Sequence, residues 1–144
     1  MGDITAANAA ILLSIPPLFP IPQQIQGFAT DDIYDIPQIK SVEVMMGVDG
    51  VLSAGFVFVQ IPQEITLQAD SPSNALFDTW WTQMQAGQTT YAAQGLIRLP
   101  SIQTKFTQTK GFLTGYKPLP GGKKLLQART YEITWERVAP APTA

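Results

Sequence analysis

The side chains that could support catalysis are few in this chain, because its 144 residues include no histidine and no cysteine. This composition excludes nucleophiles activated by imidazole, thiolate chemistry and the common zinc sites. Only carboxylate or lysine chemistry remains, and it would draw on 11 Asp+Glu and 9 Lys+Arg residues. An enzyme hypothesis for this sequence therefore depends on whether carboxylates come together in the fold.

Two groups of carboxylates have a spacing that can be evaluated. Glu132 and Glu136 fall on one face of a predicted strand, which places them about 13 Å apart, whereas paired glycosidase carboxylates lie about 5 to 9.5 Å apart. Asp31, Asp32 and Asp35 form an acidic cluster, but its spacing fits no calcium-binding loop and favours a surface turn. The sequence therefore favours a protein that is not an enzyme and has no cofactor.

The low charge of the chain points to association. Charged residues make up 14% of the sequence, against about 25% in ordinary globular domains. Because charge is depleted in interface cores, this composition is typical of a protein that packs against copies of itself, although a soluble threonine-rich β domain would share it. A net charge of −2 argues against tight non-specific binding to nucleic acid. Basic residues gather in the C-terminal half and several acidic residues in the N-terminal half, which would favour head-to-tail contact between subunits.

The elements that must position these side chains are mostly strands, since a period of two dominates the hydrophobic pattern. Val42, Val44 and Met46 alternate with other residues up to the tight-turn signal Asp49-Gly50, and an apolar run follows. This pattern predicts a hairpin whose second strand ends at Pro62. Further strands are predicted over residues 64–69, 90–99, 102–109, 111–117 and 125–138.

One segment departs from this pattern and predicts a single helix from Pro72 to Ala86. Its start can be capped by Ser71 or Asp70, and Gly87 fits its end. Its apolar stripe at helical spacing is predicted to pack on the core and consists of Leu76, Phe77, Trp80, Trp81 and Met84. Together the patterns predict a mainly β fold, an antiparallel β-sandwich or barrel with one flanking α-helix at about residues 72–86.

The two ends of the chain are predicted to lie outside the folded domain. Residues 9–15 are apolar but too short to span a membrane, so no membrane partner is expected. Residues 16–22 contain four prolines, which forbid a helix or a central strand. The sequence therefore predicts an extended N-terminal arm over residues 1–37, a β domain over 38–138 and a disordered tail over 139–144.

Four phrases of the sequence resemble small tail tube-like structural proteins of tailed bacteriophages. The phrases are GFATDD at residues 27–32, MGVDGVLS at 46–53, ITLQADSPS at 65–73 and YEITWE at 131–136. The similarity extends over about residues 4–138 of the chain.

The resemblance implies a virion structural protein, assembled in the host cytoplasm, that forms a ring of six subunits in the tail tube. In that family, strands of neighbouring subunits join into an inner barrel, and stacked rings conduct DNA, which would be a transient partner. The resemblance also allows a single-ring adaptor that joins the tube to the baseplate hub. An arm that grips a neighbour would suit the adaptor, and the candidates for this contact are Pro16, Pro17, Leu18, Phe19 and Pro20.

The lining of such a channel can be predicted from residues that alternate with core positions. The candidates are Gln103, Lys105 and Thr107 on one strand and Thr130, Glu132, Thr134 and Glu136 on another. A mixed or acidic lining would favour sliding of DNA over binding.

Two other functions are open at this point. A carbohydrate-binding β-sandwich could use exposed Trp80, Trp81 or Trp135 as a platform for sugar rings. A small enzyme could use Asp or Glu, although nothing in the sequence places two carboxylates together.

Overall fold

The computed structural model describes residues 9–16, 18–28, 34–122 and 124–142 and contains nine strands, one α-helix and one short 3₁₀ helix within these ranges. The elements are β1 (Ala10–Ile15), β2 (Phe19–Gln24), β3 (Tyr34–Asp35), β4 (Val42–Met46), β5 (Leu52–Phe56), β6 (Ile61–Leu67), α1 (Asn74–Gly87), β7 (Ala93–Leu99), η1 (Pro100–Ile102), β8 (Thr104–Gly115) and β9 (Arg129–Pro142). The predicted fold class, mainly β and antiparallel with one flanking α-helix, is confirmed. No helix in the described ranges has the length and apolar character needed to cross a membrane.

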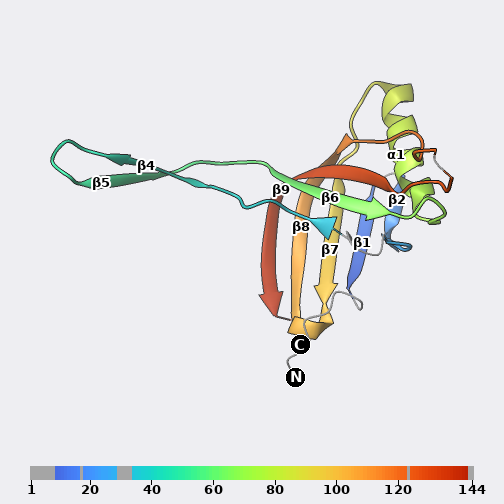
Figure 1. The fold of residues 1–144 in the computed structure, drawn as a ribbon, viewed down its shortest axis with the longest axis horizontal. Helices are drawn as coiled ribbons and strands as arrows, with labels where there is room; N and C mark the ends of the chain where they lie inside the picture. The colour runs from blue at the N-terminus through green and yellow to red at the C-terminus, as the bar shows by residue number, and fades with distance from the viewer. Residues whose placement is uncertain (1–8, 17, 29–33, 123, 143–144) are drawn as a thin grey trace.

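Seven strands form one sheet in the order β2-β1-β7-β8-β9-β6-β3, with every neighbouring pair antiparallel. The long strand β9 joins its two parts, since it pairs with β6 over residues 129–135 and with β8 over residues 132–142. The sheet curves, so that β6 runs across the direction of β1, β7 and β8 (Figure 1).

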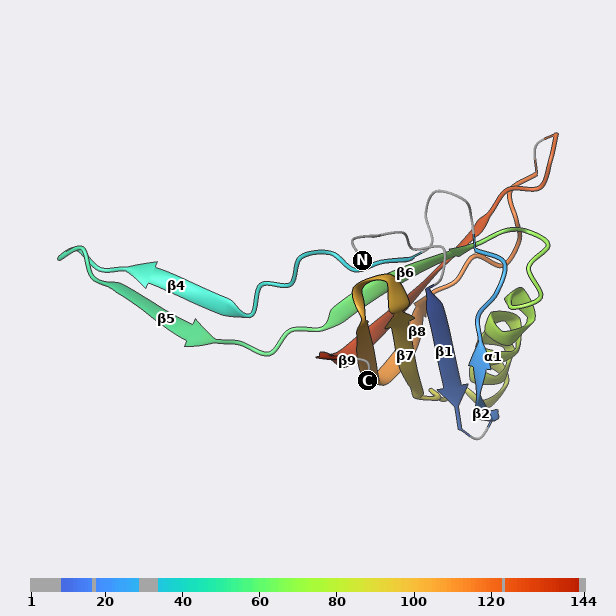
Figure 2. The same ribbon diagram turned by 90° about the horizontal axis from the view of Figure 1, so that it is seen from below.

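The second sheet consists of the hairpin β4–β5 alone, and it projects away from the body (Figures 1 and 2). The alternating patterns predicted an antiparallel β-sandwich or barrel, and the strands form one curved seven-stranded sheet and this separate two-stranded sheet.

The core lies between the curved sheet and the helix. Ile11, Tyr131 and Ile133 from the strands and Phe77 and Trp80 from the helix have no exposed surface. The Phe77 ring stacks on Tyr131 at 4.2 Å between centroids, and the Trp80 indole donates a hydrogen bond to the carbonyl of Tyr91 at 3.0 Å. Of the other stripe residues, Leu76 is buried, while Trp81 and Met84 are partly buried against the same cluster.

The helix begins two residues later than predicted, at Asn74. Ser73 occupies the cap position but makes no side-chain cap bond, because its hydroxyl accepts a hydrogen bond from the amide of Gln26 at 2.7 Å. The hydroxyl of Ser71 donates to the carbonyl of Gln26 at 2.5 Å. Both serines therefore attach the loop after β2 to the start of the helix, and the Ser71 hydroxyl also accepts a hydrogen bond from the amide of Ser73 at 3.2 Å.

The predicted N-terminal arm was wrong over much of its length. Strand β1 lies inside the seven-stranded sheet between β2 and β7, and Ile11, Leu13 and Ile15 are fully buried. The prolines at positions 20 and 22 are compatible with β2 because it is the edge strand, where a missing N–H breaks no ladder.

The predicted C-terminal tail was also wrong as far as Pro142. Strand β9 continues to this residue, and Thr104 of β8 pairs with it. The partner on its other side, β6, pairs only as far as Trp135. Pro140 and Pro142 thus lie where one side of β9 has no strand beside it, which prolines tolerate. Residues 143 and 144 lie outside the described ranges.

Three predicted strand boundaries also change. Pro62 does not end a strand but lies within β6. Strand β3, which pairs with β6 on this side, reaches only Glu64 and Ile65. Gln103 is not in a strand, because it takes a left-handed conformation (φ 54°) after the 3₁₀ helix. Lys110, also left-handed (φ 51°), forms a bulge inside one continuous strand β8 where two strands were predicted.

A buried polar cluster fixes the position of Trp135 over the sheet. The Trp135 indole N–H donates to the Oε1 atom of Gln63 at 2.8 Å, and the amide of Gln108 donates to the same oxygen at 2.6 Å. Trp135 covers Gly111 so closely that a Cβ there would lie 2.5 Å from its ring. A glycine is therefore required at position 111.

We expect Gly111→Ala to lower the free energy of unfolding by about 1 to 3 kcal/mol, because Trp135 is held in place and the added methyl overpacks the core. Urea denaturation measures this loss. Gly55→Ala is the matched control, since a Cβ at position 55 meets nothing within 4 Å. Equal midpoints for the two variants would contradict the packing described here.

Candidate assembly interface

The hairpin β4–β5 has two distinct faces. The cross-strand pairs Val42–Phe56, Val44–Ala54 and Met46–Leu52 alternate with Glu43–Gly55 and Met45–Ser53. Side chains alternate between the faces of a strand, so the first three pairs form one apolar face. This set of six residues is called the apolar hairpin face below.

The turn of the hairpin is formed by Gly47 to Val51, as Asp49-Gly50 predicted. The amide of Gly47 donates to the carbonyl of Val51 at 2.9 Å, and the Asp49 carboxylate accepts from the amide of Val51 at 3.1 Å. Gly50 has a φ of 83°, a conformation that glycine adopts without cost. The predicted hairpin is confirmed.

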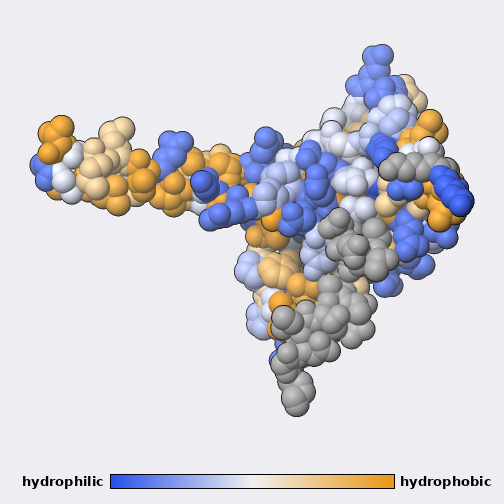
Figure 3. Space-filling model, viewed as in Figure 1, coloured by the Kyte–Doolittle hydropathy of each residue, from blue (hydrophilic) through white to orange (hydrophobic). Residues whose placement is uncertain are grey.

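The apolar hairpin face is exposed to solvent in the single chain. Val44, Met46 and Phe56 expose 61%, 62% and 66% of their surface, and Phe58 beyond β5 exposes 92%. Figure 3 shows hydrophobic surface along most of this projection. Two-stranded hairpins are marginally stable alone in water, and patches of this kind mark interaction sites. The hairpin is therefore the candidate contact surface of this protein.

The apolar hairpin face continues into a groove at the base of the hairpin. The groove has a volume of about 860 Å³ and lies between residues 56–61 and strands β8 and β9. Phe56, Phe112 and Trp135 contribute apolar walls, and Lys110 and Glu136, whose charged groups are 4.0 Å apart, also line it. Phe56 belongs to both surfaces, so the two form one apolar track.

The polar residues predicted on β9 share one face of the sheet. They alternate with the buried Tyr131, Ile133 and Trp135. The hydroxyl of Thr114 donates to Glu132 at 2.9 Å and lies 2.8 Å from that of Thr134. The candidates on this face are Thr130, Glu132, Thr134 and Glu136 of β9, with Lys105 and Thr107 of β8. Gln103 is not among them.

Sequence reasoning missed a carboxylate pair on this polar face. Glu64 of β6 lies directly opposite Glu132 of β9 in the register, although the sequence placed no two carboxylates together. Like charges in this position repel each other, so the pair makes the face locally acidic. The period of two could place Glu64 on a polar face, but only the β6–β9 register shows its partner.

The predicted arm residues lie at the first turn and the edge strand of the sheet. Pro16 and Leu18 flank the turn between β1 and β2, and Phe19 and Pro20 begin β2. Leu18 and Phe19 pack against the core, so within the single chain they are part of the domain. Pro17 lies outside the described residues, as do Asp31 and Asp32.

The three tryptophans proposed as a sugar platform are buried or partly buried, so they do not form an exposed platform. Trp80 and Trp135 are buried, and Trp81 stacks on Tyr116 at 4.8 Å between centroids. In the described ranges, no group of three or more acidic side chains gathers as a metal site would require.

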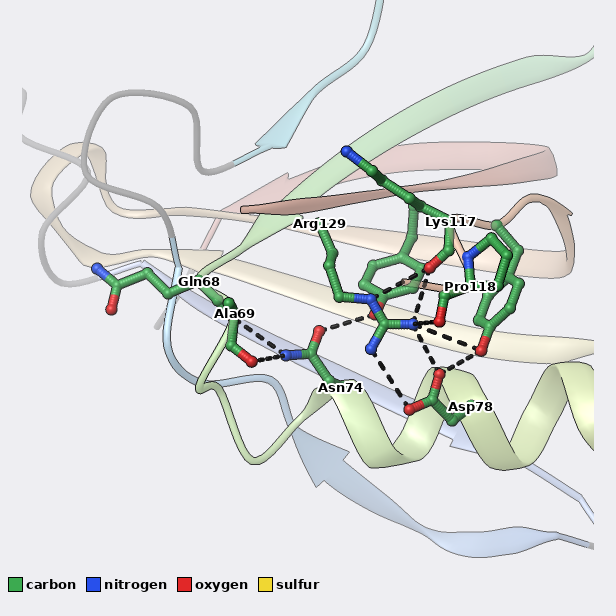
Figure 4. A network of polar contacts seen from close by, with 9 residues as sticks. Gln68, Ala69, Asn74, Asp78, Lys117, Pro118 and Arg129 are labelled. Carbon is green, nitrogen blue, oxygen red and sulfur yellow. Dashed lines mark hydrogen bonds and ion pairs between the residues drawn. The ribbon is translucent and has the colours of Figure 1, made fainter. Parts of the chain in front are cut away.

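A buried arginine attaches the helix to the loop between β8 and β9 (Figure 4). Arg129 is 6% exposed, and its guanidinium lies 2.8 Å from the carboxylate of Asp78 on the helix. The same guanidinium donates to the carbonyls of Lys117, at 2.8 Å, and Pro118, at 3.4 Å. The Tyr116 hydroxyl also donates to Asp78. Arg129 therefore fixes the base of this loop.

Asn74 makes a second attachment at the start of the helix. Its amide donates to the carbonyls of Gln68 and Ala69 at 3.0 and 3.3 Å, and its side-chain oxygen accepts from the Tyr131 hydroxyl at 2.7 Å. The helix is thus fixed to β9 and to the preceding loop, as Figure 4 also shows.

These contacts shift the pKa of the groups involved. Partial burial raises the pKa of Asp78, but hydrogen bonds from Arg129 and Tyr116 and the charge of Arg129 outweigh burial, so the pKa lies below its ordinary 3.8. Burial, and then the hydrogen bond to Asp78, raise the pKa of Tyr116. The ionised form of Asp78 is therefore the form that the fold stabilises.

A family model described as tail fiber protein gp32 matches residues 2–139 of the chain. The chain belongs to this family. No curated protein matches it. The family confirms the resemblance to structural proteins of the phage tail, and it supports a structural role in the virion tail.

Solved structures share the fold of this family member. A chain of the anti-feeding prophage baseplate is 16% identical, with 99% of this chain and 97% of that chain covered and a TM-score of 0.63. A chain of the sheath/tube terminator of an extracellular contractile injection system is 14% identical, with 91% and 92% covered and a TM-score of 0.62. A chain of the anti-feeding prophage cap is 12% identical, with 92% and 88% covered and a TM-score of 0.61. At these identities the likeness shows the fold.

We expect acid to weaken the attachment of the helix through Asp78. Because the pKa of Asp78 is lower in the folded state, its stabilisation is complete above about pH 4 and is lost as the pH falls through the folded pKa. Asp78→Asn should lower the Tm at pH 6 and reduce the dependence of Tm on pH below about pH 4. Asp70→Asn, at an exposed position before the helix, serves as the control. An unchanged acid dependence in Asp78→Asn would contradict this role.

Proposed function

We propose that this protein is a tail structural subunit that assembles into a ring, most simply of six copies, and that such rings form part of the tube through which DNA leaves the virion. The single observation that carries the proposal is the exposed apolar hairpin face. The chain folds its own core within the body, yet the hairpin leaves large apolar side chains such as Met46 and Phe56 in water.

The hairpin supports ring formation through a heterologous contact, in which the projecting hairpin of one copy packs on a different surface of the next copy. Contacts of this type generate closed rings when the rotation between copies closes. The low charge of the chain is consistent with extensive contact between copies.

Backbone pairing between subunits, expected from open sheet edges, is not favoured at the ends of the seven-stranded sheet. The β2 edge contains Pro20 and Pro22, which donate no hydrogen bond, and β3 at the other edge has only two residues. The strands β4 and β5 have no such protection. The hairpin therefore offers the better strand edges for a neighbouring subunit.

The polar face of β6 and β9 is the proposed lining of the channel. The helix packs on the opposite face of this sheet, where Phe77 contacts Tyr131, so it would face outward in a ring. Carboxylates such as Glu64 and Glu132, repeated around a ring, would repel phosphate. Lys105 would attract phosphate weakly, so DNA would slide through without being held.

The second candidate is a single-ring adaptor beside the baseplate. It is supported by the fold match to a baseplate chain, which covers 99% of this chain, and by the matches to chains of a cap and a terminator. In both cases the partners would be further copies and neighbouring tail proteins. An adaptor would stop at one ring, whereas a tube subunit would continue to add rings.

Replacing two apolar residues of the hairpin should prevent assembly without unfolding the body. We expect wild-type protein to form rings or tubes at high concentration, and the variant Val44→Asp/Phe56→Asp to remain monomeric with a nearly unchanged Tm. Size-exclusion chromatography with light scattering and negative-stain microscopy measure the outcome. The variant Met45→Asp/Ser53→Asp places the same charges on the other hairpin face. Wild-type protein that stays monomeric even with its tail partners would refute the proposal.

Charge reversal in the lining should make assembled rings retain DNA. We expect Glu132→Lys rings to bind short duplex DNA with an affinity that falls steeply as salt increases. Asp70→Lys changes the charge equally at an exposed position before the helix. Fluorescence anisotropy compares the two, and equal DNA affinities would place the β9 polar face outside the channel.

A further inference from the structure

A second exposed apolar surface lies on the loop between β8 and β9. Within its described residues, Leu119, Leu125 and Leu126 expose 74%, 77% and 65% of their surface. Three leucines this exposed on one short loop are unusual for a surface that meets only water. We call these three residues the leucine loop.

The leucine loop is held in a defined shape. The amide of Gln127 donates to the carbonyl of Gly121 at 2.9 Å, and a β-bridge joins Gly122 to Leu126. At the base of the loop, the buried guanidinium of Arg129 binds the carbonyl of Lys117. A loop that is ordered before it binds loses little conformational entropy when it binds.

The loop and the hairpin carry opposite charge. The loop sequence from Lys117 to Ala128 contains three lysines and no acidic residue. The hairpin carries Asp49 in its turn, at the end of the apolar hairpin face, whereas Glu43 lies on the other face of the hairpin. A basic apolar loop and an apolar hairpin with an acidic turn are therefore both present on one chain, and opposite charges attract one another.

The two surfaces lie at opposite ends of the molecule. In Figures 1 and 2 the hairpin extends from one end of the body, and the loop between β8 and β9 lies at the other. They cannot meet within one chain. They can meet between two copies arranged head to tail, which is the heterologous contact that a ring or a stack of rings requires.

We propose that the leucine loop of one copy docks on the apolar hairpin face of the next copy. The leucines cover the surface formed by Val44, Met46 and Phe56, and Lys124 of the loop lies near the carboxylate of Asp49 in the hairpin turn. This inference rests on the proposed function, because it names the surface that receives the hairpin in the assembly.

Cysteine cross-linking tests this contact directly, because the chain has no cysteine of its own. In the full chain, Leu126→Cys/Met46→Cys should form intermolecular disulfides under mild oxidation and give a ladder of multimers on a non-reducing gel. Leu126→Cys/Met45→Cys is the matched control, because Met45 is at least as accessible as Met46 but lies on the other face of the hairpin. All three positions are exposed, so the substitutions leave the core intact.

Charge exchange provides a second measurement on the same contact. Lys117→Glu/Lys124→Glu should raise the concentration needed for assembly about tenfold at low salt, and Asp49→Lys in the hairpin turn should weaken assembly in the same direction. Combining the three substitutions should restore part of the loss, because the charges are then exchanged rather than removed.

The outcomes separate the two proposals. If assemblies form but the Met46 pair cross-links no better than the Met45 pair, the docking contact is overturned and the proposed function stands. If no assembly and no cross-link form at any concentration, both are overturned. Preferential cross-linking through Met46, together with recovery in the charge-exchanged variant, is the result that we expect.

Discussion

The alternation of side chains along β9 is the constraint on which the rest of the structure depends. The side chains of a strand that pairs on both sides point alternately to the two faces of the sheet. Tyr131, Ile133 and Trp135 therefore lie on the buried face, toward the helix. Thr130, Glu132 and Thr134 lie on the opposite face. The buried set positions the helix and requires a glycine under Trp135. The outward set, with β6 beside it, forms the polar face proposed as a channel lining.

The body and the hairpin differ in how their apolar residues are covered. In the body, the helix closes the sheet, and the contacts of Arg129 with Asp78 and of Asn74 with Tyr131 attach it. In the hairpin, no described part of the chain covers Val44, Met46 or Phe56, which are exposed. The core of the body is thus closed, whereas the apolar hairpin face is exposed. Such a division suits a subunit that folds first and then assembles, because the assembly contact adds no strain to the core.

The same contacts that stabilise the body also prepare its surface. The buried guanidinium of Arg129 binds Asp78 on the helix, and it also donates hydrogen bonds to the carbonyls of Lys117 and Pro118 in the loop between β8 and β9. Ordering this loop gives its leucines a fixed position before any partner arrives. In the proposed assembly, one buried guanidinium would therefore link the stability of the body to the docking of this loop.

Elements with a strong local signal could be predicted from residue types and spacing alone. The hairpin around Asp49-Gly50, the single helix and the buried alternation of the last strand all follow from period, turn residues and apolar spacing. The prolines near both ends of the chain led to the wrong prediction of an arm and a tail. A proline is excluded from a strand only where a neighbouring strand would accept a hydrogen bond from the backbone N–H at that position. Whether β2 or the end of β9 has such a neighbour depends on sheet order, which no local pattern contains.

The contacts between segments that are distant in sequence depend on the folded chain as a whole. The register between β6 and β9 brings Glu64 opposite Glu132, which are far apart in sequence. The fold also determines that the hairpin projects from the body instead of packing on it. It buries Arg129, whose guanidinium binds the carboxylate of Asp78 on the helix. These features are contacts between distant segments. Their energies depend on pairing and burial that residue types and spacing along one chain do not specify.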